Sequence, residues 1–135
     1  MQTTDLGKLI VRVGIGGFFI AHGIPKFLGG TEGLKGVGSA IQHIGLDVPA
    51  LYIVFGLLAA LSETVGGLLF ALGLGFRTAC VFLTGTMAVA AGMLAANGAP
   101  FMTKVAWPIE MAILFIGFAL IGPGQYRVRI KARSA

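Results

Sequence analysis

One apolar segment dominates this sequence of 135 residues: positions 50–73 read ALYIVFGLLAALSETVGGLLFALG, with Glu63 as the only charged side chain. At the helical rise of about 1.5 Å per residue, such a segment crosses the roughly 30 Å hydrocarbon layer of a membrane. Three more segments of similar character flank it, at residues 9–28, 76–96 and 105–122. The sequence therefore predicts an all-α integral membrane protein with four spans.

The composition supports the same fold class. Apolar residues make up 56% of the chain and charged residues 11%, which is too apolar for a soluble domain of this size. Four spans occupy about 80 residues, so we expect a single domain over residues 1–135. Short connections at 73–76 and 97–104 predict an up-down-up-down four-helix bundle. For the first segment a cleaved signal peptide is the alternative, although no small-residue cleavage pattern follows it before Lys26.

The longest polar stretch, residues 29–49, separates the first two spans. Apolar side chains recur in it at intervals of three and four residues: Leu34, Val37, Ile41 and Ile44. This spacing predicts a short helix lying in the membrane interface. Gly33, Gly36 and Gly38 disfavour a helix by about 1 kcal/mol each, so an irregular lid is the alternative.

The charge distribution predicts an orientation. The formal net charge is +5, and the tail at 123–135 carries four basic residues that suit an anionic membrane surface. Seven basic residues fall on the side of the termini: Lys8, Arg12, Arg77, Arg127, Arg129, Lys131 and Arg133. Three fall on the other side: Lys26, Lys35 and Lys104. The positive-inside bias therefore predicts that both termini are cytoplasmic. Nucleic acid is not an expected partner, because the basic residues form no single face.

Glu63 lies near the middle of the second span, where a lipid-facing carboxylate would be costly. Small residues, among them Gly66 and Gly67, follow it on one helical stripe, and they leave room for a neighbouring helix or a flat ligand. We therefore expect Glu63 to face the bundle interior. An internal salt bridge or a protonated, hydrogen-bonded carboxyl group is the alternative to a catalytic role.

His22 and Lys26 lie one turn apart on the first span, and Pro25 between them predicts a kink or a helix end at Ile24. The alternatives to a functional role are that His22 is an interior histidine with its hydrogen bonds made within the bundle, and that Lys26 extends its side chain to the membrane interface.

Trp107 and Glu110 open the fourth span. Counting about 1.5 Å per residue, His22 and Glu110 share a level about 8–9 Å below the outer edge. Lys26 and Trp107 lie about 3 Å below that edge by the same count. We expect His22 and Glu110 to approach each other beneath a mouth formed by the other two, unless Trp107 is only an interfacial belt residue.

Metal, haem and flavin are not expected in this chain. The only histidines are His22 and His43, one in a span and one in a loop, and no flavin fingerprint is present. The single cysteine, Cys80, excludes an internal disulfide, a cysteine redox pair and a thiolate-held cluster within one chain.

Several of these residues together resemble the DoxX family. The resemblance covers residues 6–124 and rests on Arg12, Gly16, Phe18, His22-Gly23-x-x-Lys26-Phe27, Glu63-x-x-Gly66-Gly67-x-Leu69, Leu72-Gly73, Arg77 and Gly122-Pro123-Gly124. The resemblance implies a four-helix bacterial or archaeal membrane protein; some members are linked to quinone-dependent thiosulfate oxidation, others to membrane oxidoreductase complexes or to quinone and thiol stress. The family's Ser-Leu-Asp ending is replaced here by residues 125–129, so no role is carried over from that aspartate.

The residues and the resemblance together predict a quinone-linked oxidoreductase subunit in the cytoplasmic membrane, binding quinone or a small anionic or sulfur substrate. We expect Glu63 and His22 to be catalytic, and the ligand to contact Lys26, Glu110, Trp107, Gly66 and Gly67. The expected partners are the lipid bilayer and a peripheral or membrane redox protein that supplies electrons; homo-oligomerisation and independent catalysis are left open. A scaffold for a peripheral redox enzyme and a small proton-coupled transporter are the alternatives.

Overall fold

The computed structural model describes residues 3–129, which form helices connected by short turns. In chain order the elements are α1 (Thr3–Leu28), α2 (Gly30–Gly38), the 3-10 helix η1 (Ser39–Ile44), α3 (Pro49–Leu61), the π-helical turn η2 (Ser62–Gly66), α4 (Gly67–Leu72), α5 (Phe76–Ala96), the π-helical turn η3 (Phe101–Val105) and α6 (Ala106–Ile121).

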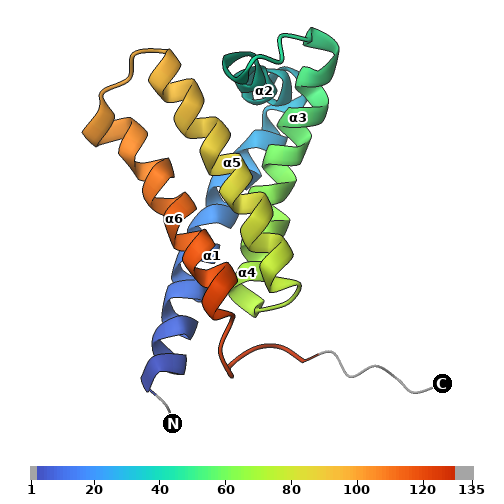
Figure 1. Cartoon of the computed structure of the whole chain (residues 1–135). Coiled ribbons are helices and arrows are strands. Elements are labelled where there is room, and N and C mark those ends of the chain that lie inside the picture. Colours follow the sequence, from blue (N-terminus) through green and yellow to red (C-terminus); the bar gives the residue numbers. More distant parts are fainter. Residues whose placement is uncertain (1–2, 130–135) are drawn as a thin grey trace, which may run out of the picture.

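Four helical rods run up, down, up and down: α1, then α3 continued by η2 and α4, then α5, then η3 with α6 (Figure 1). Each rod is long and apolar enough to cross a membrane. The predicted all-α fold with four spans is therefore confirmed. The first rod begins at Thr3 and the last at Phe101, both earlier than the apolar runs suggest, because hydropathy does not detect the polar terminal turns of a helix.

The first helix does not end at Ile24. It continues through Pro25 to Leu28, and the Pro25 carbonyl oxygen accepts a hydrogen bond from the Gly29 N–H at 3.1 Å, so the alternative of a helix end at Ile24 is wrong. The basic tail is described only as far as Arg129. Two residues of the orientation count, Lys131 and Arg133, lie outside the described residues.

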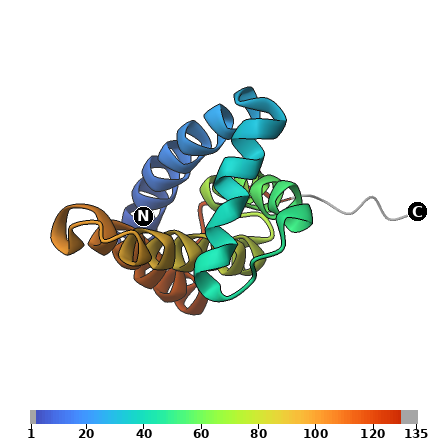
Figure 2. The ribbon, with the colours of Figure 1, turned by 90° about the horizontal axis from the view of Figure 1, so that it is seen from above.

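A short helix does occupy the stretch between the first two spans. Seen from above, α2 and η1 lie across the end of the bundle (Figure 2), where α2 packs on α3 and η1 reaches α5. A Cβ added to Gly38 would lie 1.7 Å from the Tyr52 carbonyl oxygen, and one added to Gly56 would lie 1.9 Å from that of Leu34. Gly38, one of the glycines that disfavour a helix in this stretch, thus allows backbone contact with α3, and Gly56 allows it from the side of α3.

Glycines also bring the first span against the second. A Cβ on Gly16 would lie 2.6 Å from the Gly67 carbonyl oxygen, and a Cβ on Gly23 would lie 2.8 Å from the Thr64 nitrogen. Small residues of this kind allow close helix packing in membranes, where no hydrophobic effect drives helices together. This contact fixes the height of α1 relative to η2.

Aromatic side chains from four helices fill the half of the bundle nearer the termini. Phe70 lies at their centre, with ring centroids 5.1 Å from Phe76 and from Phe115 and 5.3 Å from Phe118. Phe19 of α1 joins them through an edge contact with Phe115 at 5.0 Å. A pocket of about 460 Å³ remains at the end of this half, where Gly73, Phe76 and Arg77 line it. A second cavity, which reaches Lys26 and Glu63, lies in the other half.

Candidate functional site

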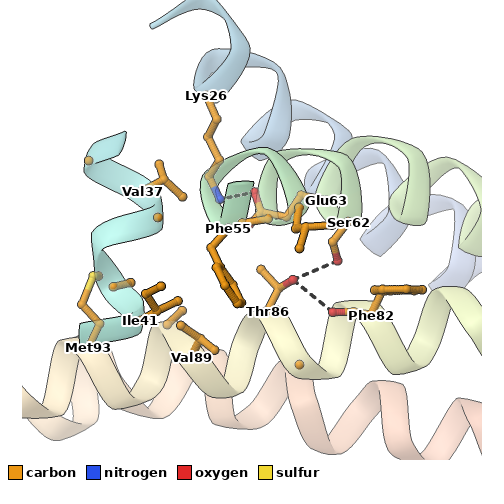
Figure 3. Close-up of a pocket in the computed structure, with 17 residues that line it drawn as sticks. Lys26, Val37, Ile41, Phe55, Ser62, Glu63, Phe82, Thr86, Val89 and Met93 are labelled. Carbon is orange, nitrogen blue, oxygen red and sulfur yellow. Dashed lines mark hydrogen bonds and ion pairs between the residues drawn. The ribbon is translucent and has the colours of Figure 1, made fainter. Parts of the chain in front are cut away.

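A cavity of about 540 Å³ lies in the half of the bundle covered by α2 and η1. Its walls come from α1, α2, η1, α3, η2 and α5 (Figure 3). Ligand sites in proteins have volumes of about 300–1,000 Å³ and are mostly apolar with a few placed polar groups. This cavity fits that description, since its charged and hydroxyl side chains are limited to Lys26, Ser62, Glu63 and Thr86.

The polar end of the cavity is an ion pair between Lys26 of α1 and Glu63 of η2. The Glu63 side chain is 5% exposed and that of Lys26 is 23% exposed. Among the described residues, Lys26 is the only partner of the buried Glu63 Oε2. The expectation that Glu63 faces the interior is confirmed, and the ion pair is the salt bridge that the sequence left open as an alternative.

The position of Lys26 differs from the expected one. Counting residues placed it about 3 Å and Glu63 about 15–20 Å below the outer edge, yet their charged groups meet. The count ignores helix tilt and the length of the lysine side chain. Lys26 therefore belongs to the interior of the cavity and forms no mouth with Trp107.

The π-helical turn at η2 positions Glu63 and separates it from the glycines that follow. Such a turn carries one extra residue, so it rotates the downstream helix by about 100° relative to an unbroken α-helix. Before the turn, Phe55 and Ala59 face the cavity, and Ser62 and Glu63 at the start of the turn face it as well. Gly66, the last residue of the turn, lies against Leu83 of α5, and Gly67 directly after the turn contacts α1. π-Turns of this kind occur frequently at functional sites.

A hydroxyl pair forms a second polar point on the cavity wall. Thr86 Oγ1 of α5 lies 2.9 Å from Ser62 Oγ and 3.0 Å from the Phe82 carbonyl oxygen. Thr86 has one hydroxyl hydrogen; if it donates this to the carbonyl, Ser62 donates to Thr86. If Thr86 instead donates to Ser62, the Ser62 hydrogen is free to reach a ligand.

The remaining wall is apolar and shaped by side chains from three elements. The Phe55 ring points into the cavity from α3, toward Thr86 (Figure 3). Val37 and Ile41 close the side of α2 and η1, and Val89 and Met93 continue the face of α5. These walls suit a flat apolar molecule.

His22 and Trp107 lie together, but outside the cavity. Their ring centroids are 5.6 Å apart, and the exposed His22 donates from Nδ1 to the Phe18 carbonyl oxygen at 2.8 Å. Trp107 also stacks on Phe19 at 6.3 Å, so the first and fourth spans are neighbours as expected.

Glu110 is exposed on α6, and none of the hydrogen bonds or ion pairs found in residues 3–129 joins it to His22. Glu110, Gly66 and Gly67 do not line the cavity either. Of the seven predicted site residues, the structure therefore brings Lys26 and Glu63 together at the cavity and His22 and Trp107 together elsewhere.

The third span contributes the cavity wall that the sequence assigned to the fourth. Thr86, Val89 and Met93 of α5 line the space, whereas α6 does not. The sequence analysis did not identify Ser62 or Thr86 as site residues. Ser62 adjoins Glu63, and Thr86 is a hydroxyl residue at helical spacing from Val89 and Met93, so each carried a usable signal. The apolar wall residues carried no signal that distinguishes them from lipid-facing ones.

The arrangement defines a class of protein: a four-helix membrane bundle with an apolar cavity, whose polar end offers a cationic donor, a carboxylate and hydroxyl groups. Such a set can hold a flat molecule by its oxygen atoms and can exchange protons with it.

The comparisons with known proteins show that this chain belongs to the DoxX family. The family model, described as DoxX, matches residues 7–97. These residues include most of α1, all of α2 to α5 and every residue of the cavity wall. The protein is a multi-pass membrane protein with four candidate spans. A protein of Bacillus subtilis (strain 168) named "Putative oxidoreductase CatD" is 30% identical over 121 residues, which cover 90% of this chain and 83% of the relative. No solved structure matches significantly.

Proposed function

We propose that this protein is a membrane-embedded subunit of a quinone-linked oxidoreductase system and that a quinone head group binds in the cavity beside Lys26 and Glu63. The observation that carries the proposal is the ion pair at the end of an otherwise apolar cavity. The name of the Bacillus subtilis relative as an oxidoreductase supports the same class of function.

The cavity residues have separate roles in this proposal. The Lys26 ammonium donates a hydrogen bond to one carbonyl oxygen of the head group, and a charged donor makes that bond about twice as strong as a neutral one. The Ser62–Thr86 hydroxyl pair donates to the other carbonyl oxygen. Phe55 and the aliphatic walls pack on the two ring faces and exclude water.

Glu63 supplies and removes protons. A quinone takes up two electrons and two protons on reduction to a quinol, so its site needs a proton donor that can be recharged. The electrons come from a partner oxidoreductase, peripheral or membrane-bound. The proposal places His22, Trp107 and Glu110 outside the head-group site, so it does not include the catalytic role expected of His22 or the ligand contacts expected of Trp107 and Glu110.

Equilibrium binding tests this proposal directly. The purified protein in lipid nanodiscs is titrated with dimethylnaphthoquinone, a tailless quinone whose ring positions are blocked against thiol addition. We expect saturable binding to the wild type, about tenfold weaker binding by Lys26→Met and a smaller loss in Ser62→Ala. Ser62→Ala removes one hydroxyl group and leaves the ion pair intact, so this variant still tests the site if Lys26→Met does not fold.

Matched controls come from a second ion pair among residues 3–129. Lys35 and Glu32 form an exposed pair on α2, with Nζ and Oε1 2.9 Å apart, and they lie outside the cavity wall. Lys35→Met and Glu32→Gln should therefore bind the quinone as the wild type does. Absence of saturable binding to the folded wild type would refute the proposal and leave a scaffold role as the better account.

A further inference from the structure

The cavity has an opening on the side of the bundle as well as a polar end. Leu58 of α3 and Phe82 of α5 line it and are 47% and 55% exposed, and Gly85 of α5 is also exposed. The Glu63 end is buried by comparison. The cavity thus runs from a polar, enclosed end to an apolar, open one.

The packing of the helices explains the opening. The second and third spans meet at η2 and α4, and at the outer end α5 meets η1, but α3 and α5 have no extensive packing in between. The two helices therefore form the sides of an aperture, with η2 below it and η1 above it. Figure 3 shows the cavity between these elements, with Phe82 at the far end of the α5 wall.

The aperture opens at the depth of the acyl chains. Gly85 follows Phe76, the first residue of α5, by nine positions, which is about 13 Å at the rise of an α-helix. With the start of α5 at the edge of a hydrocarbon layer roughly 30 Å thick, this point is near the middle of the layer. A molecule that extends through the aperture then reaches the acyl chains.

We infer that the aperture between α3 and α5 holds the isoprenoid tail of a long-chain quinone, whose head group lies at Lys26 and Glu63. This inference rests on the proposed function and specifies its substrate: a membrane-dissolved quinone that enters from the side, with its tail crossing Leu58, Phe82 and Gly85. A water-soluble quinone or a small anion carries no apolar tail that could occupy such an opening.

A bulky residue at Gly85 tests the inference. A Cβ added there meets nothing within 4 Å and the backbone needs no left-handed angle, so Gly85→Trp fills the aperture without strain. Gly17→Trp is the matched control, because Gly17 is an exposed helical glycine on α1, also with nothing within 4 Å, and lies outside the cavity wall.

The ligands form a matched pair as well. A long-chain menaquinone carries the same ring as dimethylnaphthoquinone, with a tail in place of one methyl group. Each ligand is titrated into nanodiscs by displacement of labelled dimethylnaphthoquinone. We expect Gly85→Trp to weaken the menaquinone by at least about tenfold and the tailless quinone by less than about twofold, and Gly17→Trp to change neither.

The experiment distinguishes failure of the tail site from failure of the head-group site. Unchanged menaquinone affinity in Gly85→Trp, or an equal loss for both quinones, would overturn the inference while leaving the head-group site in place. If the folded wild type binds neither quinone, the proposed function fails and this inference fails with it.

Discussion

The guanidinium group of Arg12 donates a hydrogen bond to the carbonyl oxygen of Pro123, a residue 111 positions later in the chain. Its other terminal nitrogen donates to the carbonyl oxygens of Ala71 at 2.9 Å and Tyr126 at 2.8 Å. Arg12 is 1% exposed. One buried side chain on α1 therefore ties the end of α4 to the segment that follows the last span.

Replacing Arg12 should loosen this end of the bundle. Hydrogen bonds from a charged donor contribute about 1.5–3 kcal/mol each, so Arg12→Leu should lower the free energy of unfolding by at least about 2 kcal/mol. Denaturant titration in bicelles measures the change. Arg129→Leu is the control, because Arg129 is exposed and makes no side-chain hydrogen bond to the described residues; equal stability of the two variants would contradict the assignment.

A methyl group at Gly56 should separate α2 from α3. The added Cβ would lie 1.9 Å from the Leu34 carbonyl oxygen, and backbone shifts of this kind cost about 1–3 kcal/mol. Gly14→Ala is the control, since Gly14 is exposed on α1 with nothing within 4 Å; it should leave stability unchanged or raise it by up to about 1 kcal/mol. A fully stable Gly56→Ala protein would show that α2 does not pack as described.

The ion pair of Lys26 and Glu63 should behave as a coupled unit. Lys26→Met leaves a buried carboxylate unpaired, which should cost about 3 kcal/mol of unfolding free energy, the low end of the usual range because Lys26 is partly exposed. Adding Glu63→Leu should recover most of that loss, because the charge is then gone. Additive effects in this double-mutant cycle would mean that the two residues are independent.

Glu63→Gln should separate proton transfer from binding. Glutamine keeps an oxygen that accepts a hydrogen bond from Lys26, so folding and quinone affinity should stay near those of the wild type. Loss of the titratable proton should reduce quinol formation with the partner oxidoreductase by at least about a hundredfold. Lys26→Ala should instead raise the dissociation constant for quinone. Normal turnover in Glu63→Gln would remove the proton relay from the proposal.

The orientation in the membrane remains a prediction from charge. The first helix, α1, begins and the last helix, α6, ends at the same end of the bundle (Figure 1), and most basic residues of the sequence flank that end. A reporter fused after Ala135 should be active only if it works in the cytoplasm. Activity of a periplasmic reporter at that position would reverse the orientation, and the lid of α2 and η1 would then face inward.

The four spans were predictable from sequence because hydropathy is a local property. A run such as residues 50–73 must be helical and buried in lipid or protein whatever its neighbours do. The same reasoning placed Glu63 inside the bundle, since a lone carboxylate in lipid is too costly. It also found the short helix at residues 30–44 from the spacing of its apolar side chains.

Only the tertiary structure decided which groups meet. The heights and rotations of the spans depend on contacts such as Gly16 with Gly67, and these are not encoded in the periodicity of either helix. They bring Lys26 to Glu63 and place His22 against Trp107. The π-turn at η2 interrupts the helical face that Glu63 would share with Gly66 and Gly67 in an unbroken α-helix, so these two glycines do not line the cavity. The sequence by itself determined the spans and the burial of the carboxylate, while helix packing determined the cavity, because a ligand site is a relation between helices.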